Sequence, residues 1–153
     1  MWTKTKSLFL SRILTGVAAG LLAIMTVYIP AISEWYDDVS VSGGILGSHS
    51  IVIPMSITLY ICEALAFGAL WSLNRLLENI NKEQVFVPEN TTCLRRISWI
   101  CMIMGFVLCI FSIWRSIFLF AAFLVIMFGL VMRVLKNVFE KAVEIKSEND
   151  FTI

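Results

Sequence analysis

Residues 97–132 read ISWICMIMGFVLCIFSIWRSIFLFAAFLVIMFGLVM, and only the tripeptide WRS at 114–116 interrupts their apolar character. One continuous helix over this stretch would be about 54 Å long, whereas the hydrocarbon layer of a membrane is about 30 Å thick. Two helices joined by a hairpin at the tripeptide would each cross the layer once. We therefore expect spans at about 97–114 and 116–132, with Arg115 extending to the outer headgroups.

Two further apolar runs precede this stretch, at about 13–32 and 51–73, and both are long enough to span a membrane as helices. Hydrophobic residues make up 59% of the chain and charged residues 15%, whereas about a quarter of the residues in a soluble domain are charged. The sequence therefore predicts an all-α integral membrane protein. Its four spans are expected to form a four-helix bundle in a single domain, 1–153.

Positive charges gather in three segments that share one side of a four-span protein. Of the twelve Lys and Arg residues, three precede the first run, four lie between the second and third runs, and four follow the last. The segment between the first two runs carries three acidic residues and no Lys or Arg. By the positive-inside rule, both termini and the loop at 74–96 are cytoplasmic, and the loop at 33–50 is outside. We expect a multi-pass protein of the cell membrane.

The outer loop at 33–50 is too short to fold by itself. Its Asp37, Asp38 and His49 are candidate ligands for a cation or a basic peptide, but no pattern in the sequence gives them a defined geometry. The simpler interpretation is a solvated connector between the first two spans.

Small residues recur at helical spacing in three of the spans, where they let helix backbones approach closely in lipid. The candidate packing residues are Gly16 and Gly20, Ala64 and Gly68, and Gly105. Gly16 and Gly20 form a GxxxG step, which serves either packing within the bundle or homodimerisation. The four cysteines include no CxxC pair, and we expect them to be packing residues rather than metal ligands.

Glu63 is the one acidic residue within a span, and a carboxylate near the bilayer centre costs about 3 kcal/mol on insertion scales. At about 100° per residue it shares one face of the second helix with Ser56 and Tyr60. The simpler interpretation is a protonated carboxyl that is hydrogen-bonded to a backbone carbonyl or to Thr15, Thr26 or Tyr28. The alternative is a proton-linked or cation-linked site.

The second and fourth helices are predicted to continue past the membrane boundary as amphipathic helices. An apolar stripe extends the second helix at Leu73, Leu76, Leu77 and Ile80. A similar stripe extends the fourth helix at Val131, Leu135, Val138, Ala142 and Ile145. We expect these extensions to pair with each other, so that they form a small cytoplasmic helical cap with a helical tail at 133–153.

Short motifs in the cytoplasmic segments resemble those of a known family. They are the NI-containing helix end at 76–80, F-x-x-E-N at 86–90, L-R-R-I at 94–97 and the terminal E-N-D-F-T-I at 148–153. Together they resemble the bacterial "domain of unknown function 2975" (DUF2975) membrane family, whose members end in E-N-D-L-T-V. Members of that family often carry Gly shortly after the NI step, where this chain has Asn-Lys-Glu-Gln at 81–84.

The resemblance implies four spans with cytoplasmic ends in a bacterial cytoplasmic membrane. It also implies a gene that often stands beside a small helix-turn-helix regulator, so that a cytoplasmic surface binding such a regulator is a reasonable hypothesis. The candidate residues are Asn79, Glu89, Asn90, Arg95, Arg96, Glu148, Asn149 and Asp150. The structural alternative is that the acids of the tail bond to the two arginines, or to the start of the third helix, and close the cap.

Two classes of function follow. The first is a non-enzymatic membrane adaptor or sensor whose cytoplasmic cap docks a soluble partner. The second is a small transporter-like or immunity membrane protein that uses Glu63. An enzyme is not expected, because the chain has one His and lacks the H-E-x-x-H, G-x-S-x-G and phosphate-binding glycine motifs. We expect no cofactor and no direct nucleic-acid binding; the expected partners are the lipid bilayer, a soluble regulator and a second copy of the chain.

Overall fold

The computed structural model describes residues 4–40, 45–46 and 50–150, with side chains between Leu8 and Asn149 in those ranges. They form four helices, α1 (Lys4–Val39), α2 (Val52–Asn81), α3 (Pro88–Phe111) and α4 (Ile117–Asp150). Each helix contains a stretch that is long and apolar enough to cross a membrane. The all-α fold with four membrane-length helices is therefore confirmed, and the hairpin between the last two lies where the WRS tripeptide predicts it.

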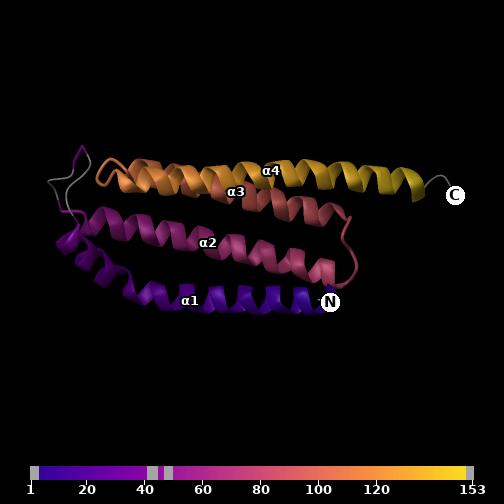
Figure 1. The fold of residues 1–153 in the computed structure, drawn as a ribbon, viewed down its shortest axis with the longest axis horizontal. Coiled ribbons are helices and arrows are strands. Elements are labelled where there is room, and N and C mark those ends of the chain that lie inside the picture. The colour runs from indigo at the N-terminus through magenta and orange to yellow at the C-terminus, as the bar shows by residue number, and fades with distance from the viewer. Residues whose placement is uncertain (1–3, 41–44, 47–49, 151–153) are drawn as a thin grey trace.

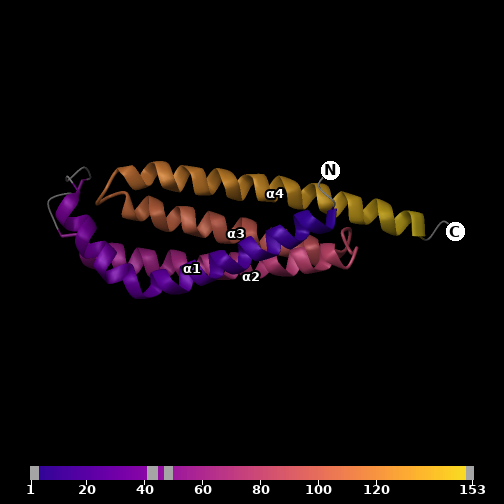
Figure 2. The same ribbon diagram turned by 60° about the horizontal axis from the view of Figure 1, so that its bottom comes forward.

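The four helices lie side by side in chain order (Figure 1). α1 packs on α2, α2 on α3, and α3 most extensively on α4. Among the residues that the structure describes, α1 and α4 meet through side chains near one end, where the ring centroids of Tyr36 and Phe118 lie 6.1 Å apart. Figure 2 shows α1 inclined to the other three helices. Away from this contact the helices form an open row, and its two outermost helices expose broad apolar faces.

Both chain ends lie at one end of the row, beside the turn between α2 and α3 (Figure 1). We call it the basic end, because all but one of the Lys and Arg residues belong to the helix ends and the turn found there. α4 extends beyond the other helices at this end (Figure 1).

The expected pairing of the α2 and α4 extensions is wrong, because the row places α3 between these two helices and they share no contact in the described ranges. The α4 extension instead contacts the start of α3 and the turn before it. The rings of Phe139 and Phe86 lie 6.0 Å apart between centroids, and Glu140 Oε1 lies 3.5 Å from a terminal nitrogen of Arg95.

α1 is longer than the first predicted span, because helix continues through 33–39 where a loop was expected. This stretch contains neither Gly nor Pro, and the Ser33 hydroxyl donates a hydrogen bond to the Ile29 carbonyl at 2.9 Å. Pro30 lies within the helix, and α1 bends near this end (Figure 1), as a missing backbone N–H permits. The described part of the connection to α2 therefore begins at Ser40.

Arg115 does not extend to the headgroups as expected; only 5% of its side chain is exposed. Its guanidinium lies 3.5 Å from Asp37 Oδ1, and its Nε donates to Ser40 Oγ at 3.0 Å. A buried guanidinium requires a counter-charge, and Asp37 supplies it from the end of α1.

Asp37 is consequently not part of a solvated connector. It also accepts hydrogen bonds from Ser50 Oγ at 2.8 Å and from the backbone N–H of Ile51 at 3.2 Å. One carboxylate thus joins α1, the start of α2 and the turn between α3 and α4. Asp38 is exposed, and His49 lies outside the described residues.

Candidate functional site

Two buried asparagines join the end of α2 to the start of α3. Asn79 is 7% exposed and Asn90 is fully buried. Asn79 Nδ2 donates to Asn90 Oδ1 at 2.8 Å, and Asn90 Nδ2 donates to the carbonyls of Gln84 and Val85 at 2.8 and 2.7 Å. Asn90 therefore uses its acceptor and both of its donors to hold the turn. Because both side chains are enclosed, this asparagine pair fixes the α2–α3 turn through contacts within the chain.

The turn between α2 and α3 is tight despite the absence of glycine. The backbone N–H of Gln84 donates to the Asn79 carbonyl at 2.9 Å, and Glu83 has a φ of 61°. This left-handed conformation favours glycine and costs another residue about 1 kcal/mol. Glu83 thus occupies a strained position in the stretch 81–84, which contains no Gly.

A hollow of about 480 Å³, which we call the charged hollow, lies beside the asparagine pair. Two exposed ion pairs line it: Arg75 with Glu89 at 3.7 Å and Lys82 with Glu78 at 2.8 Å. The hydrogen bond from Lys82 lowers the pKa of Glu78. Exposed pairs of this kind contribute little stability, so these side chains can exchange partners at little cost.

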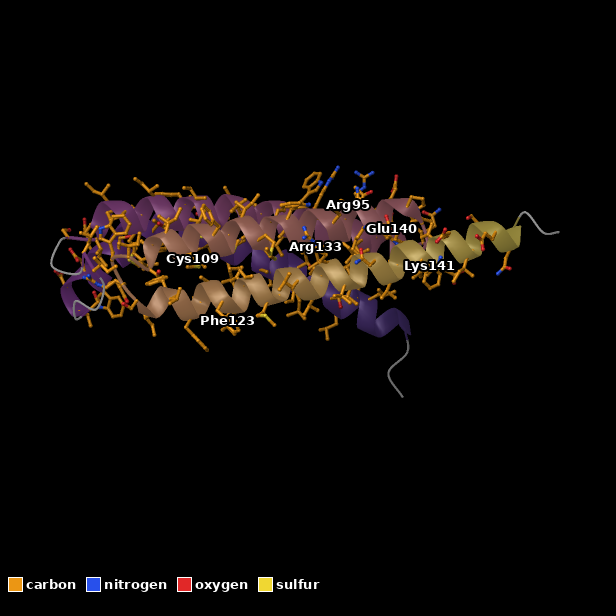
Figure 3. All side chains as sticks on the ribbon, turned by 90° about the horizontal axis from the view of Figure 1, so that it is seen from above. Arg95, Cys109, Phe123, Arg133, Glu140 and Lys141 are labelled. Carbon is orange, nitrogen blue, oxygen red and sulfur yellow. The ribbon has the colours of Figure 1, made fainter. Side chains whose placement is uncertain are left out.

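The two arginines at the start of α3, Arg95 and Arg96, are both exposed. Arg95 is paired with Glu140, and Figure 3 shows these side chains close together. Lys136 also donates to Glu140 and lowers the pKa of its carboxyl. α4 runs on as one helix, so Glu148 lies about 12 Å further along it than Glu140.

Closure of the cap by the acids of the tail is therefore not what the described residues show. A continuous α4 carries the tail away from the start of α3 instead of folding it back. Glu148 and Asn149 are exposed on this helix, and the side chain of Asp150 lies outside the described residues.

An exposed apolar stripe runs along the α4 extension. A helix that starts at Ile117 crosses a layer of about 30 Å in roughly 20 residues, so α4 leaves the layer near residue 137. Val138 is 58% exposed and Ile145 is 50% exposed beyond that point. Phe139, about 80° round the helix from the centre of this stripe, contacts the turn. The α4 stripe comprises Val131, Leu135, Val138, Ala142 and Ile145.

Glu63 is 8% exposed and lies on the side of α2 that contacts α1. Thr26 Oγ1 lies 2.6 Å from Glu63 Oε1 and 3.2 Å from the Leu22 carbonyl oxygen. At the shorter of these two distances, Thr26 donates its one hydroxyl proton to Glu63 across the α1–α2 interface. Thr26 is one of the partners predicted from the sequence, and this contact is confirmed.

The other two polar residues on this face of α2 also contact α1. Tyr60 donates a hydrogen bond to the Thr26 carbonyl at 3.4 Å. This carbonyl lacks its usual helical donor, because Pro30, four residues later, has no backbone N–H. Ser56 Oγ lies 3.0 Å from Ser33 Oγ. The polar face of α2 is thus an interface within the chain, and such contacts are compatible with the packing interpretation of Glu63.

Of the small residues singled out in the sequence, Gly105 makes the closest approach. A Cβ there would lie 3.1 Å from Ile126 Cδ1 and 3.3 Å from the Ala122 carbonyl oxygen. Gly129 of α4, which sequence reasoning missed, has a similar role: Ser98 Oγ donates to its carbonyl at 2.8 Å. The seven-residue spacing of Ala122 and Gly129 is the signal that could have placed both on one face of α4.

The remaining small residues behave differently. A Cβ at Gly68 would make ordinary contact with Ile100 at 3.4 Å, whereas a Cβ at Gly16 or Gly20 would meet nothing within 4 Å. Ala64 is exposed. Packing within the chain therefore explains Gly105 and, more loosely, Gly68, but it does not explain the GxxxG step.

No group of three or more His, Cys, Asp or Glu side chains among the described residues is arranged to hold a metal ion. The four cysteines are free, and all four lie within the membrane-length helices α2 and α3. The candidate site is therefore the surface of the basic end: the charged hollow, the exposed arginines and the α4 stripe.

Comparison with known proteins supports one family. The family model "Protein of unknown function (DUF2975)" matches residues 45–153. The match includes α2, α3 and α4 and therefore the whole surface of the basic end described above. No curated protein matches the chain, and no solved structure matches it.

Proposed function

The chain belongs to the DUF2975 family of proteins of unknown function, and we propose that it is a non-enzymatic membrane adaptor or sensor whose basic end binds a soluble protein in the cytoplasm. The positive-inside rule supports this orientation, because nearly all Lys and Arg residues belong to that end.

The observation that carries the proposal is the α4 stripe. Val138 and Ile145 are about half exposed. Along α4, both lie farther from Ile117 than the thickness of the lipid layer. Apolar side chains at this spacing form a seam that a second amphipathic helix can cover. Among the described residues, the α4 extension contacts α3 and the turn before it and no other helix of this chain, so a helix of another protein is the proposed occupant.

The surroundings of the stripe support a specific contact. The asparagine pair holds the α2–α3 turn, and Phe86 of that turn packs on Phe139 of α4, so the surface has a defined shape. The exposed charges of Glu140, Arg95 and Arg96 lie at the base of the α4 extension and can select a partner by charge. The gene association implied by the family resemblance identifies a small helix-turn-helix regulator as the partner to test first.

The test is purification of the tagged protein from its native membrane, with mass spectrometry of the soluble proteins that accompany it. We expect the double variant Val138→Glu/Ile145→Glu to lower recovery of the partner at least tenfold. The matched control Asn137→Glu/Ser147→Glu adds the same charge on other faces of α4 and should leave recovery unchanged. Equal recovery with both double variants would exclude the α4 stripe as the docking surface.

Orientation is tested separately with a Ser147→Cys variant and a membrane-impermeant thiol reagent. The unmodified chain has four free cysteines of its own, and its labelling is the background. We expect the variant to be labelled above this background only after the membrane is permeabilised. Labelling of intact cells would place the basic end outside and remove the basis for a cytoplasmic partner.

A further inference from the structure

An apolar groove of about 460 Å³ lies between α2 and α3 near the basic end. α2 contributes Gly68, Trp71 and Ser72, and α3 contributes Arg95, Arg96, Trp99, Ile100 and Ile103. The α3 residues are ordered along the helix, so Ile103 lies about 10 Å deeper than Arg96. The groove thus has an apolar floor toward the centre of the helices and a cationic mouth toward the basic end.

The groove is hollow because two of its three α2 residues, Gly68 and Ser72, are small. Gly68 has no side chain, and even a Cβ there would only just touch Ile100, at 3.4 Å. Ser72 is 4% exposed, and its hydroxyl donates to the Gly68 carbonyl of its own helix at 3.0 Å. The hydroxyl is therefore satisfied within α2. An apolar ligand at this part of the wall would meet no unpaired polar group.

Two tryptophans place the mouth of the groove at the membrane surface. Trp71 is 73% exposed and Trp99 is 54% exposed, and large indole rings favour the boundary between hydrocarbon and headgroups. The guanidinium of Arg133 lies 5.0 Å from the centroid of the Trp99 ring, a cation–π contact that orients the ring. The arginines that follow Trp71 and Trp99 toward the basic end are therefore at headgroup depth.

The charge at the mouth is positive. Arg96 makes no ion pair with any of the described residues, and Arg95 has only the exposed contact with Glu140 at 3.5 Å. An exposed pair of that kind is weak, so Arg95 can also approach a second anion. The mouth therefore presents two guanidinium groups, which bind phosphate oxygens well, above a channel of hydrocarbon character.

We propose that this groove binds one anionic phospholipid of the leaflet at the basic end. An acyl chain lies between Gly68 and Ile103, and the phosphate group contacts Arg95 and Arg96. The chemistry of the groove matches both parts of such a molecule, since basic pockets between membrane helices attract anionic headgroups. This inference requires only that the helices lie in a membrane and does not depend on a soluble partner.

The test is native mass spectrometry of the full chain in detergent, titrated with dioleoyl phosphatidylglycerol or dioleoyl phosphatidylcholine. Both lipids have the same acyl chains, so the ratio of their affinities reports the headgroup. We expect one tightly bound phosphatidylglycerol with about thirty-fold preference over phosphatidylcholine, from about fivefold for each arginine near the surface.

Three variants separate the parts of the proposal. Arg95→Gln/Arg96→Gln should reduce the preference to about twofold or less, whereas Lys141→Gln/Lys146→Gln removes the same charge from α4 and should keep the preference. Gly68→Leu should lower the affinity for both lipids at least fivefold, because its side chain fills the floor. A wild-type protein without preference, an unchanged preference after loss of both arginines, or full affinity in Gly68→Leu would each overturn the proposal.

Discussion

Substitution of Asn90 by alanine tests whether the asparagine pair holds the basic end together. Asn90 is fully buried, donates to the carbonyls of Gln84 and Val85 and accepts a hydrogen bond from Asn79. The variant removes all three bonds at once and leaves two carbonyl groups and one amide group without these partners.

The expected loss follows from the three bonds. Each contributes about 1 kcal/mol net, so Asn90→Ala should lower the free energy of unfolding by about 3 kcal/mol. Asn79→Ala removes only one of them, together with a weak contact to Glu89 at 3.4 Å, and should cost about 1 kcal/mol. Asn90→Asp keeps the acceptor but turns carboxylate oxygens toward both carbonyls, so it should cost at least as much as alanine.

The measurement is reversible unfolding in mixed micelles, followed by circular dichroism, with hydrogen exchange of residues 82–87 as a local report. Asn81→Ala is the matched control, because Asn81 is the exposed last residue of α2 in the same turn. We expect it to change the free energy by less than about 0.5 kcal/mol. An Asn90→Ala variant as stable as this control, with unchanged exchange in the turn, would refute the reasoning.

Three further predictions concern single positions. Glu83→Gly should stabilise the protein by about 1 kcal/mol in the same assay, because glycine adopts a φ of 61° without strain, whereas Glu83→Ala should bring no gain. Glu63→Gln should change stability by less than about 1 kcal/mol, because the amide oxygen can accept the hydrogen bond from Thr26 as a carboxyl oxygen does; a loss of activity with intact stability would favour the ion-linked alternative. Asp37→Ala should cost about 3–5 kcal/mol by leaving the buried Arg115 without its carboxylate, and adding Arg115→Met should recover part of this loss; a double variant no better than the single one would show that the ion pair is not the cause.

The arrangement of the basic end also relates the two proposals. The lipid groove lies between α2 and α3, whereas the α4 stripe lies on the far side of the α3–α4 pair. Arg95 lines the groove and is paired with Glu140, so it links the groove to the α4 extension.

Some features followed from the sequence because they depend on local pattern. The number of spans is determined by the length of the apolar runs against the thickness of the lipid layer. The length of the 97–132 run required a hairpin, and the WRS tripeptide located it. The shared face of Ser56, Tyr60 and Glu63 follows from helical periodicity, as does the row of small residues that includes Gly105. These properties need no knowledge of which helix lies beside which.

Other features were decided by the tertiary structure. Arg115 is buried because Asp37, far away in sequence, lies at the end of a longer α1. The α4 stripe is exposed because α3 lies between α2 and α4, so the two extensions cannot meet. Periodicity identifies the apolar face of a helix but not its neighbour, since the neighbour depends on how all four helices pack, and in lipid that packing is governed by close contact rather than by burial of apolar surface.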